Sequence, residues 1–200
     1  MRKLKIAVLV SGGGTNLGAL IKAQSSGVLT SGEIALVISN VRSAYALERA
    51  RIANIPSTVI TKKEAGSQEK FEESIINALE QNGIEIIVLA GFMSILSENF
   101  TKKYDKRIIN VHPSLIPSFC GKGYYGLKVH EEALKTGVKV TGATVHFVNE
   151  IPDGGEIIMQ KAVAVRDGDT PETLQKRVMR LAEWVILPRS VEKVCKAMIK

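Results

Sequence analysis

Short apolar runs alternate with segments of helical spacing along most of this chain. The runs rich in β-branched residues are expected to be strands: Ile6 to Val10, Ile34 to Ser39, Ser57 to Ile60, Ile84 to Ala90 and Arg107 to Val111. Their unbroken apolar stretches fit strands buried on both faces. Between them, residues 43–53 are rich in helix formers, and residues 71–79 carry apolar side chains on one helical face. This alternation predicts an α/β fold on an open, doubly wound, mostly parallel sheet.

The pattern changes after Pro113. Residues 114–126 contain Gly, Pro and aromatic residues and predict a long loop, which in compact domains is usually functional or mobile. Residues 131–136 then predict a helix. Two more strands, Ala143 to Val148 and Ile157 to Val165, are expected to pair antiparallel at one edge of the sheet.

A long C-terminal helix is expected next. Thr170 fits its N-cap and Pro171 its first position, while Pro188 is expected to kink or divide it. No repeat or linker interrupts the chain, so we expect a single domain over residues 1–200.

The composition indicates the class of protein and the cellular compartment. The 200 residues are 45% hydrophobic and 24% charged, which is ordinary for a globular protein. Cys120 and Cys195 form no CxxC pair and favour a reducing compartment. The first apolar run is too short for a signal peptide, and no stretch approaches a membrane span, so we expect a cytoplasmic protein without a membrane partner.

The net charge of +7 invites a nucleic-acid hypothesis. The basic residues form only short clusters, such as Lys62-Lys63 and Lys102-Lys103, and no aromatic platform lies among them. A solvated face and an anionic small-molecule substrate explain the charge about as well. We therefore expect small-molecule partners and no nucleic acid.

A glycine loop, residues 11–16 (Ser-Gly-Gly-Gly-Thr-Asn), follows the first strand. Glycines let an anion approach backbone amides, and the helix expected to begin near Asn16 favours a phosphate at its N-terminus. A dinucleotide fingerprint fails because Leu17 replaces its third glycine and no acidic residue ends the second strand. A phosphate-bearing substrate is favoured, with a βα turn that binds nothing as the alternative.

Asn110 and His112 end the fifth expected strand and point to the same side of it. An amide donor beside an imidazole suits acyl-type transfer, because the amide stabilises an oxyanion while the imidazole moves a proton. The alternative is a histidine that only binds a loop carbonyl. Asp153, before two glycines, either caps a turn or raises the pKa of the imidazole and orients it.

The remaining histidines are weaker candidates. His130 is expected near a helix start and solvated, and His146, in mid-strand, is more consistent with a structural role. No HExxH or Cys/His cluster predicts a metal site, and no Gly-x-Ser-x-Gly motif predicts a serine hydrolase.

Four motifs in order resemble the phosphoribosylglycinamide formyltransferase family, folate-dependent enzymes of de novo purine biosynthesis with a Rossmann-like fold. They are the glycine loop, Leu89 to Met93, Asn110 to Pro117, and Val145 to Val148 followed by Asp153-Gly154-Gly155. The resemblance runs from about Lys5 to Pro188.

The resemblance implies transfer of the formyl group of 10-formyltetrahydrofolate, as a co-substrate and without a metal, to the amine of 5-phosphoribosylglycinamide. Asn110 would hold the formyl oxygen, His112 would be the general acid, and Asp153 would pair with His112 and help position water. The protein would be a monomer or a homodimer.

The resemblance also assigns binding residues. The residues implied for the phosphoribosyl substrate are Gly14, Thr15, Asn16 and Glu183. Those implied for the folate are Met93, Ser94, Ile95 and Leu96 at the pterin, Asn110, and the closing loop Asn149, Glu150, Ile151 and Pro152.

Some positions depart from the family pattern. Ser94 and Trp184 stand where Arg and His are expected, and Gln68 replaces an Arg thought to meet the folate's glutamate tail. Lys62, Lys63 or Lys70 are the candidate replacements.

Two rival folate enzymes are less consistent with this sequence. A methionyl-tRNA formyltransferase normally has an extra C-terminal domain, and a formyltetrahydrofolate deformylase an extra N-terminal one. A phosphate-binding module without catalysis would not need Asn110, His112 and Asp153 together.

Overall fold

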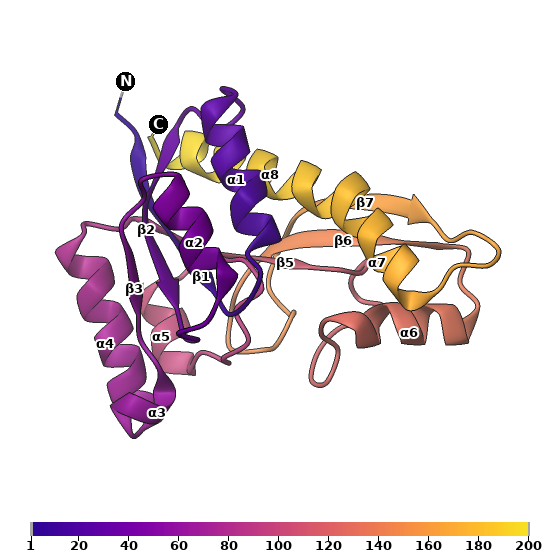
Figure 1. Ribbon diagram of the computed structural model, residues 1–200, viewed down its shortest axis with the longest axis horizontal. Coiled ribbons are helices and arrows are strands. Elements are labelled where there is room, and N and C mark those ends of the chain that lie inside the picture. Colours follow the sequence, from indigo (N-terminus) through magenta and orange to yellow (C-terminus); the bar gives the residue numbers. More distant parts are fainter. Residues whose placement is uncertain (1, 200) are drawn as a thin grey trace.

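One seven-stranded sheet organises the computed structural model, which describes residues 2–199 (Figure 1). Its order is β3-β2-β1-β4-β5-β6-β7. The strands are β1 (Leu4–Val10), β2 (Gly32–Ser39), β3 (Ser57–Val59), β4 (Ile86–Leu89), β5 (Ile108–His112), β6 (Val140–Phe147) and β7 (Ile157–Ala164). Neighbours from β3 through β5 pair parallel, whereas β6 pairs antiparallel with both β5 and β7. The predicted sheet, with its antiparallel edge, is confirmed.

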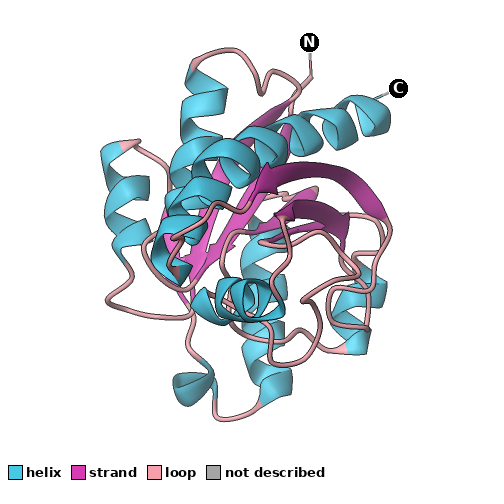
Figure 2. Ribbon diagram, turned by 90° about the vertical axis from the view of Figure 1, so that its right-hand side faces the viewer, coloured by secondary structure: helices cyan, strands magenta, loops and turns pink. Residues whose placement is uncertain are grey.

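Helices cover both faces of this sheet (Figure 2). They are α1 (Thr15–Ser25), α2 (Tyr45–Ile52), α3 (Lys62–Ala65), α4 (Gln68–Gln81), α5 (Glu98–Lys103), α6 (Leu127–Thr136), α7 (Pro171–Val178) and α8 (Trp184–Ile199), with a π-helical turn, η1 (Met179–Glu183), between the last two. Within residues 2–199, no helix is long and apolar enough to cross a membrane.

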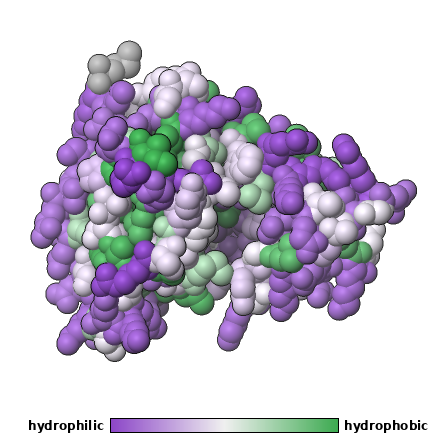
Figure 3. All heavy atoms as spheres, in the orientation of Figure 1, coloured by the Kyte–Doolittle hydropathy of each residue, from purple (hydrophilic) through white to green (hydrophobic). Residues whose placement is uncertain are grey.

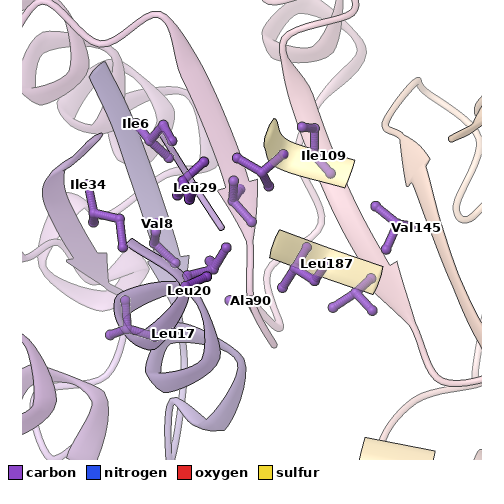
Figure 4. Close-up of a cluster of buried hydrophobic side chains, with 14 of the residues drawn as sticks. Ile6, Val8, Leu17, Leu20, Leu29, Ile34, Ala90, Ile109, Val145 and Leu187 are labelled. Atoms are coloured by element: carbon purple, nitrogen blue, oxygen red, sulfur yellow. The ribbon is translucent and has the colours of Figure 1, made fainter. Parts of the chain in front are cut away.

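The core divides into two layers because successive strand residues point to opposite faces. In β1, Ile6 and Val8 pack with α1, α2, α7 and α8, whereas Ala7 and Leu9 pack with α4 and α5. Figure 4 shows the first layer, in which side chains from β1, α1 and α8 meet those of β5 and β6. β1 is therefore buried on both faces, as its unbroken apolar run predicts.

The helix start after the long loop differs from the prediction. α6 begins at Leu127, four residues before the expected Glu131. His130 therefore lies within the helix, fully buried, and the expectation that it is solvated is wrong.

The C-terminal helix begins as predicted, with Thr170 as N-cap and Pro171 in the first turn. Its division lies at η1, however, and Pro188 sits inside α8. A proline ring clashes with the carbonyl four residues earlier. For Pro188 that residue is Trp184, where α8 starts. The regular helix is therefore interrupted before the proline and not at it.

Glu192 ties α8 to the loop before β2. Its buried carboxylate accepts hydrogen bonds from the backbone N–H groups of Thr30 and Ser31, each at 2.9 Å, and from both hydroxyls. Burial raises the pKa of Glu192, but the N–H of Ser31, the hydroxyl of Thr30 and nearby Lys196 outweigh it and lower the pKa to about 2. The carboxylate is thus an anionic clamp at neutral pH.

Replacing this clamp should cost stability. We expect Glu192→Ala to lower the free energy of unfolding by about 2 kcal/mol, because several donors lose a charged acceptor. Lys196→Ala, which removes only the exposed partner, should cost less than about 0.5 kcal/mol. Urea unfolding of both variants measures the difference, and equal losses would contradict this role of Glu192.

Candidate functional site

The glycine loop after β1 is shaped by its contact with α2. Gly14 is the N-cap of α1 and has φ +67°, and a Cβ there would lie 2.7 Å from the Cβ of Ala46. Only glycine fits both constraints. A Cβ at Gly12 or Gly13 would meet nothing within 4 Å. These two positions therefore border open space.

The carbonyls of the same loop face α2. The Gly12 carbonyl accepts from the N–H of Ala46 at 3.0 Å, and the Gly13 carbonyl accepts from Arg49 Nε at 2.8 Å. Within residues 2–199, the backbone N–H groups from Gly12 to Asn16 donate to no carbonyl. Free amides at a helix N-terminus suit an anion.

Asn16 connects this loop with the C-terminal helices. Asn16 Nδ2 donates to Glu183 Oε2 at 2.8 Å, and both side chains are buried. Burial raises the pKa of Glu183, partly offset by this bond. The structure thus brings together Gly14, Thr15, Asn16 and Glu183, as the resemblance implies, and η1 ends at Glu183.

The candidate catalytic residues lie on the face of the sheet that also packs α4 and α5. On β5, Asn110 pairs with His146 of β6, and His112 pairs with Thr144. Their neighbours in sequence, such as Ile109 and Val145, point to the opposite core layer. Figure 3 shows the surface hollowed between the part that carries β1 to β4 and the part that carries α6.

Asp153 reaches these residues by a fold-back of its loop. Because β6 is antiparallel to β5, the loop after β6 starts beside the amino end of β5, away from the rim where β5 ends. It returns so that Asp153 Oδ2 lies 3.4 Å from His112 Nδ1 and Oδ1 lies 3.6 Å from His146 Nε2. The expected convergence of Asn110, His112 and Asp153 is present.

The long loop between β5 and α6 closes over His112. His112 Nε2 lies 2.8 Å from the carbonyl oxygen of Phe119, and the N–H of Gly121 donates to Asp153 Oδ2 at 2.8 Å. His112 is only 4% exposed. Since a carbonyl only accepts, His112 Nε2 carries a proton in this arrangement.

Burial has the largest effect on the pKa of His112. Desolvation lowers the pKa of His112 below its ordinary value and outweighs the opposing effects of Asp153 and the Phe119 carbonyl. Asp153 does raise this pKa, as expected, but by less than burial lowers it. For Asp153, burial raises the pKa, but His146, His112 and the N–H of Gly121 together lower it, so the carboxylate is ionised.

The segment implied for the pterin is held by hydrogen bonds from four directions. Met93 N–H donates to Ser11, Asn40 Nδ2 donates to Ser94 Oγ, and Gln68 Nε2 donates to the Ile95 carbonyl, at 2.8, 2.8 and 3.1 Å. Glu72 accepts from the N–H of Ser97, just beyond Leu96. Such ties fix the shape of a segment that has no regular secondary structure.

Gln68, the first residue of α4, therefore helps to hold residues 93–96 in place. The same Nε2 also donates to Glu72 Oε1 at 2.6 Å, so one amide nitrogen makes both hydrogen bonds. Lys62, Lys63 and Lys70, the candidate cations for an acidic tail, are exposed.

The loop 149–152 is the more open of the two implied folate elements. Asn149 Oδ1 accepts from the Ile151 N–H at 3.0 Å and closes a short turn, while the Ile151 side chain is exposed. Glu150 is exposed as well, and Pro152 precedes Asp153, whose φ is +56°. This tight turn aims Asp153 back at His112.

Sequence patterns missed several residues around the site. Arg49 braces the glycine loop, and Arg180 lines, with Thr15 and Trp184, a groove of about 680 Å³ between α1 and the C-terminal helices. This groove adjoins the glycine loop rather than Asn110 and His112. His146 is also missed, because its contact with Asn110 depends on strand pairing. No cluster of three or more His, Cys, Asp or Glu residues fit to hold a metal occurs between residues 2 and 199.

His130 adds a buried imidazole behind the site. Neither ring nitrogen has a hydrogen-bond partner within the described chain. Burial, with a smaller effect from His112, lowers the pKa of His130 to about 4. At neutral pH the ring is uncharged.

Comparisons with known proteins agree on one family. Residues 4–191 match the formyl transferase model. The chain is 41% identical to the phosphoribosylglycinamide formyltransferase of Haemophilus influenzae, over 92% of this chain and 84% of that protein. The crystal structure of glycinamide ribonucleotide transformylase 1 from Symbiobacterium toebii superposes with a TM-score of 0.91 at 37% identity, covering 98% of this chain and 89% of the other.

Longer relatives match as well. The chain is 45% identical to the trifunctional purine biosynthetic protein adenosine-3 of Gallus gallus over 99% of its own length. It spans only 19% of that protein, about a fifth of its length.

The low pKa of His130 predicts an acid-sensitive fold. An unfolded histidine binds a proton below pH 6.5, whereas the folded His130 binds one only near pH 4, so stability falls as the pH drops through this window. Between pH 8 and pH 5 we expect the titration of His130 to lower the free energy of unfolding by roughly 2 kcal/mol. Urea unfolding of wild type and His130→Gln at both pH values measures it. An equal pH dependence in the two proteins would contradict the burial of a neutral ring.

Proposed function

The chain belongs to the formyl transferase family, and we propose that it transfers the formyl group of 10-formyltetrahydrofolate to the amine of 5-phosphoribosylglycinamide, a step of de novo purine biosynthesis. The observation that carries this proposal is the meeting of Asn110, His112 and Asp153 in one place, beside a glycine loop with free amides.

Formyl transfer needs hydrogen-bond donors for the formyl oxygen and a group that carries a proton, and these residues supply both. The substrate amine attacks the formyl carbon, and the carbonyl oxygen gains negative charge. Asn110 Nδ2 and the protonated Nε2 of His112 are donors for that oxygen. When the bond between the formyl carbon and the folate nitrogen breaks, the amine has lost a proton and the leaving nitrogen has gained one. His112 and the ionised Asp153 are placed to carry it.

The substrate's other end matches the glycine loop. Its phosphate accepts from the free amides between Gly12 and Asn16. Glu183, with Asn16, takes the ribose hydroxyls, because a carboxylate accepts two hydroxyl hydrogen bonds. The folate lies between residues 93–96, Asn110 and the loop 149–152.

The long loop has to open for this reaction. The Phe119 carbonyl accepts from the same His112 Nε2 that would donate to the substrate. One N–H donates well to one acceptor, so the oxygen of Phe119 leaves before the formyl oxygen arrives.

We also propose a cellular compartment, partners and an oligomeric state. The free thiols Cys120 and Cys195 fit a reducing cytoplasm, and the partners are small molecules, with the protein acting as a monomer or a homodimer.

A comparison of acceptors tests this function. We expect purified protein with 10-formyltetrahydrofolate to formylate phosphoribosylglycinamide far faster than methionyl-tRNA or water. His112→Ala should lower kcat roughly 10²- to 10⁴-fold, since a positioned acid is lost. Lys196→Ala, remote from the site, is the control for purification and folding.

Two outcomes would contradict the proposal. A folded wild-type protein that prefers water or tRNA as acceptor would assign it to another formyl-transfer reaction. Equal rates for wild type and His112→Ala would remove His112 from the chemistry.

Glu183 should act on substrate binding. We expect Glu183→Gln to raise the KM for phosphoribosylglycinamide by roughly 10-fold or more, because a charge-assisted hydrogen bond is lost, with little change in the KM for the folate. Glu192→Gln, a buried acid farther along the C-terminal helices, is the matched control. If both variants shift KM equally, Glu183 has no direct part in binding.

A further inference from the structure

We propose that His146 is a positioning residue: as a neutral imidazole it fixes which way the Asn110 amide faces. The proposal rests on the proposed function, since it concerns the donor for the formyl oxygen. Nothing in the sequence pattern separates His146 from a structural strand residue.

The strand register puts the two side chains together. Asn110 and His146 are direct partners in the antiparallel pair of β5 and β6, and both point to the site face. Asn110 Nδ2 lies 3.2 Å from His146 Nε2. The His146 ring is fully enclosed, at 1% exposure, so this contact is shielded from water.

The other ring nitrogen decides the tautomer. His146 Nδ1 lies 2.7 Å from the carbonyl oxygen of Phe147, which only accepts, so Nδ1 carries the proton. In a neutral ring Nε2 then has a lone pair and accepts. Only the NH₂ side of the Asn110 amide satisfies it, and the amide oxygen would meet it lone pair to lone pair.

The orientation matters because the amide has two ends of opposite character. With one Nδ2 hydrogen on His146, the second hydrogen of the same nitrogen remains for the formyl oxygen, and no other partner of Nδ2 occurs among the described residues. A turned amide would present its oxygen to a developing oxyanion. A donor fixed in advance stabilises the transition state without reorganisation.

Asp153 does not replace Asn110 as the partner of His146. Its Oδ1 is 3.6 Å from Nε2, beyond hydrogen-bond range, and its Oδ2 is held by Gly121 at 2.8 Å.

The sheet is irregular at this residue. The ladder between β6 and β7 shifts register between Val145 and His146. Such bulges commonly re-aim a side chain next to an active site. A purely structural position in a buried strand would be filled more simply by an apolar residue, which needs no hydrogen-bond partners.

A double-mutant cycle tests the proposal through kcat. We expect His146→Leu to lower kcat roughly 10-fold or more, with both KM values within about twofold, because a transition-state contact is lost and not a binding one. In an Asn110→Ala background the same change should lower kcat less than about twofold, since no amide remains to orient. His146→Gln, whose amide oxygen accepts, should restore most of the rate.

The control is another buried histidine. His130→Gln, tested in the same two backgrounds, should show equal effects in both, because His130 does not contact the Asn110 amide. If His146→Leu also lowers kcat equally in both backgrounds, His146 does not act through Asn110 and the proposal is overturned.

A spectroscopic measurement decides the proposal independently of activity and of the variants' folding. In ¹⁵N-labelled wild-type protein near neutral pH, the His146 Nε2 resonance should be that of an unprotonated, pyridine-like nitrogen. A protonated Nε2 would overturn the proposal. A wild-type protein without formyl transfer would refute the proposed function while leaving this tautomer test intact.

Discussion

The antiparallel register between β5 and β6 is the constraint on which the site depends. It sets Asn110 opposite His146 and His112 opposite Thr144, on a single face of the sheet. Because strand side chains alternate, a slip of one residue would turn Asn110 and His112 into the apolar layer and expose Ile109 and Val111 in their place. That slip would bury an amide and an imidazole among aliphatic side chains. The same hydrophobic alternation that stabilises the sheet therefore fixes the relative positions of the polar groups.

Loops, together with η1, supply the other parts of the site. The glycine loop is held by α2 through its carbonyls, which leaves its amides free, and η1 brings Glu183 to Asn16. The loop after β6 folds back to place Asp153, and the loop after β5 covers His112 with the Phe119 carbonyl. Burial has a consequence for the chemistry. It lowers the pKa of His112, while the Phe119 carbonyl accepts from Nε2 and so marks that nitrogen as the hydrogen-bond donor.

Local patterns in the sequence predict much of this architecture. The strands, the N-cap at Thr170 and the rim position of Asn110 and His112 follow from apolar runs, capping residues and the period of two. Contacts that depend on distant segments are not predictable in this way. The role of His146 needs its strand partner, and the burial of His130 follows from a helix start that carries no side-chain cap at Gly126. The direction of the His112 pKa depends on a loop that closes over it. Gln68, which replaces an Arg of the family pattern, likewise binds the Ile95 carbonyl of a segment distant in sequence.

The most direct measurement is a crystal structure with phosphoribosylglycinamide and a stable analogue of the formylfolate bound together. We expect the oxygen that stands for the formyl oxygen to accept from Asn110 Nδ2 and His112 Nε2, the phosphate to lie on the amides after Gly12, and the Phe119 carbonyl to have left His112. Ligands bound elsewhere, for example in the groove along α1 with Phe119 still on His112, would contradict this expectation.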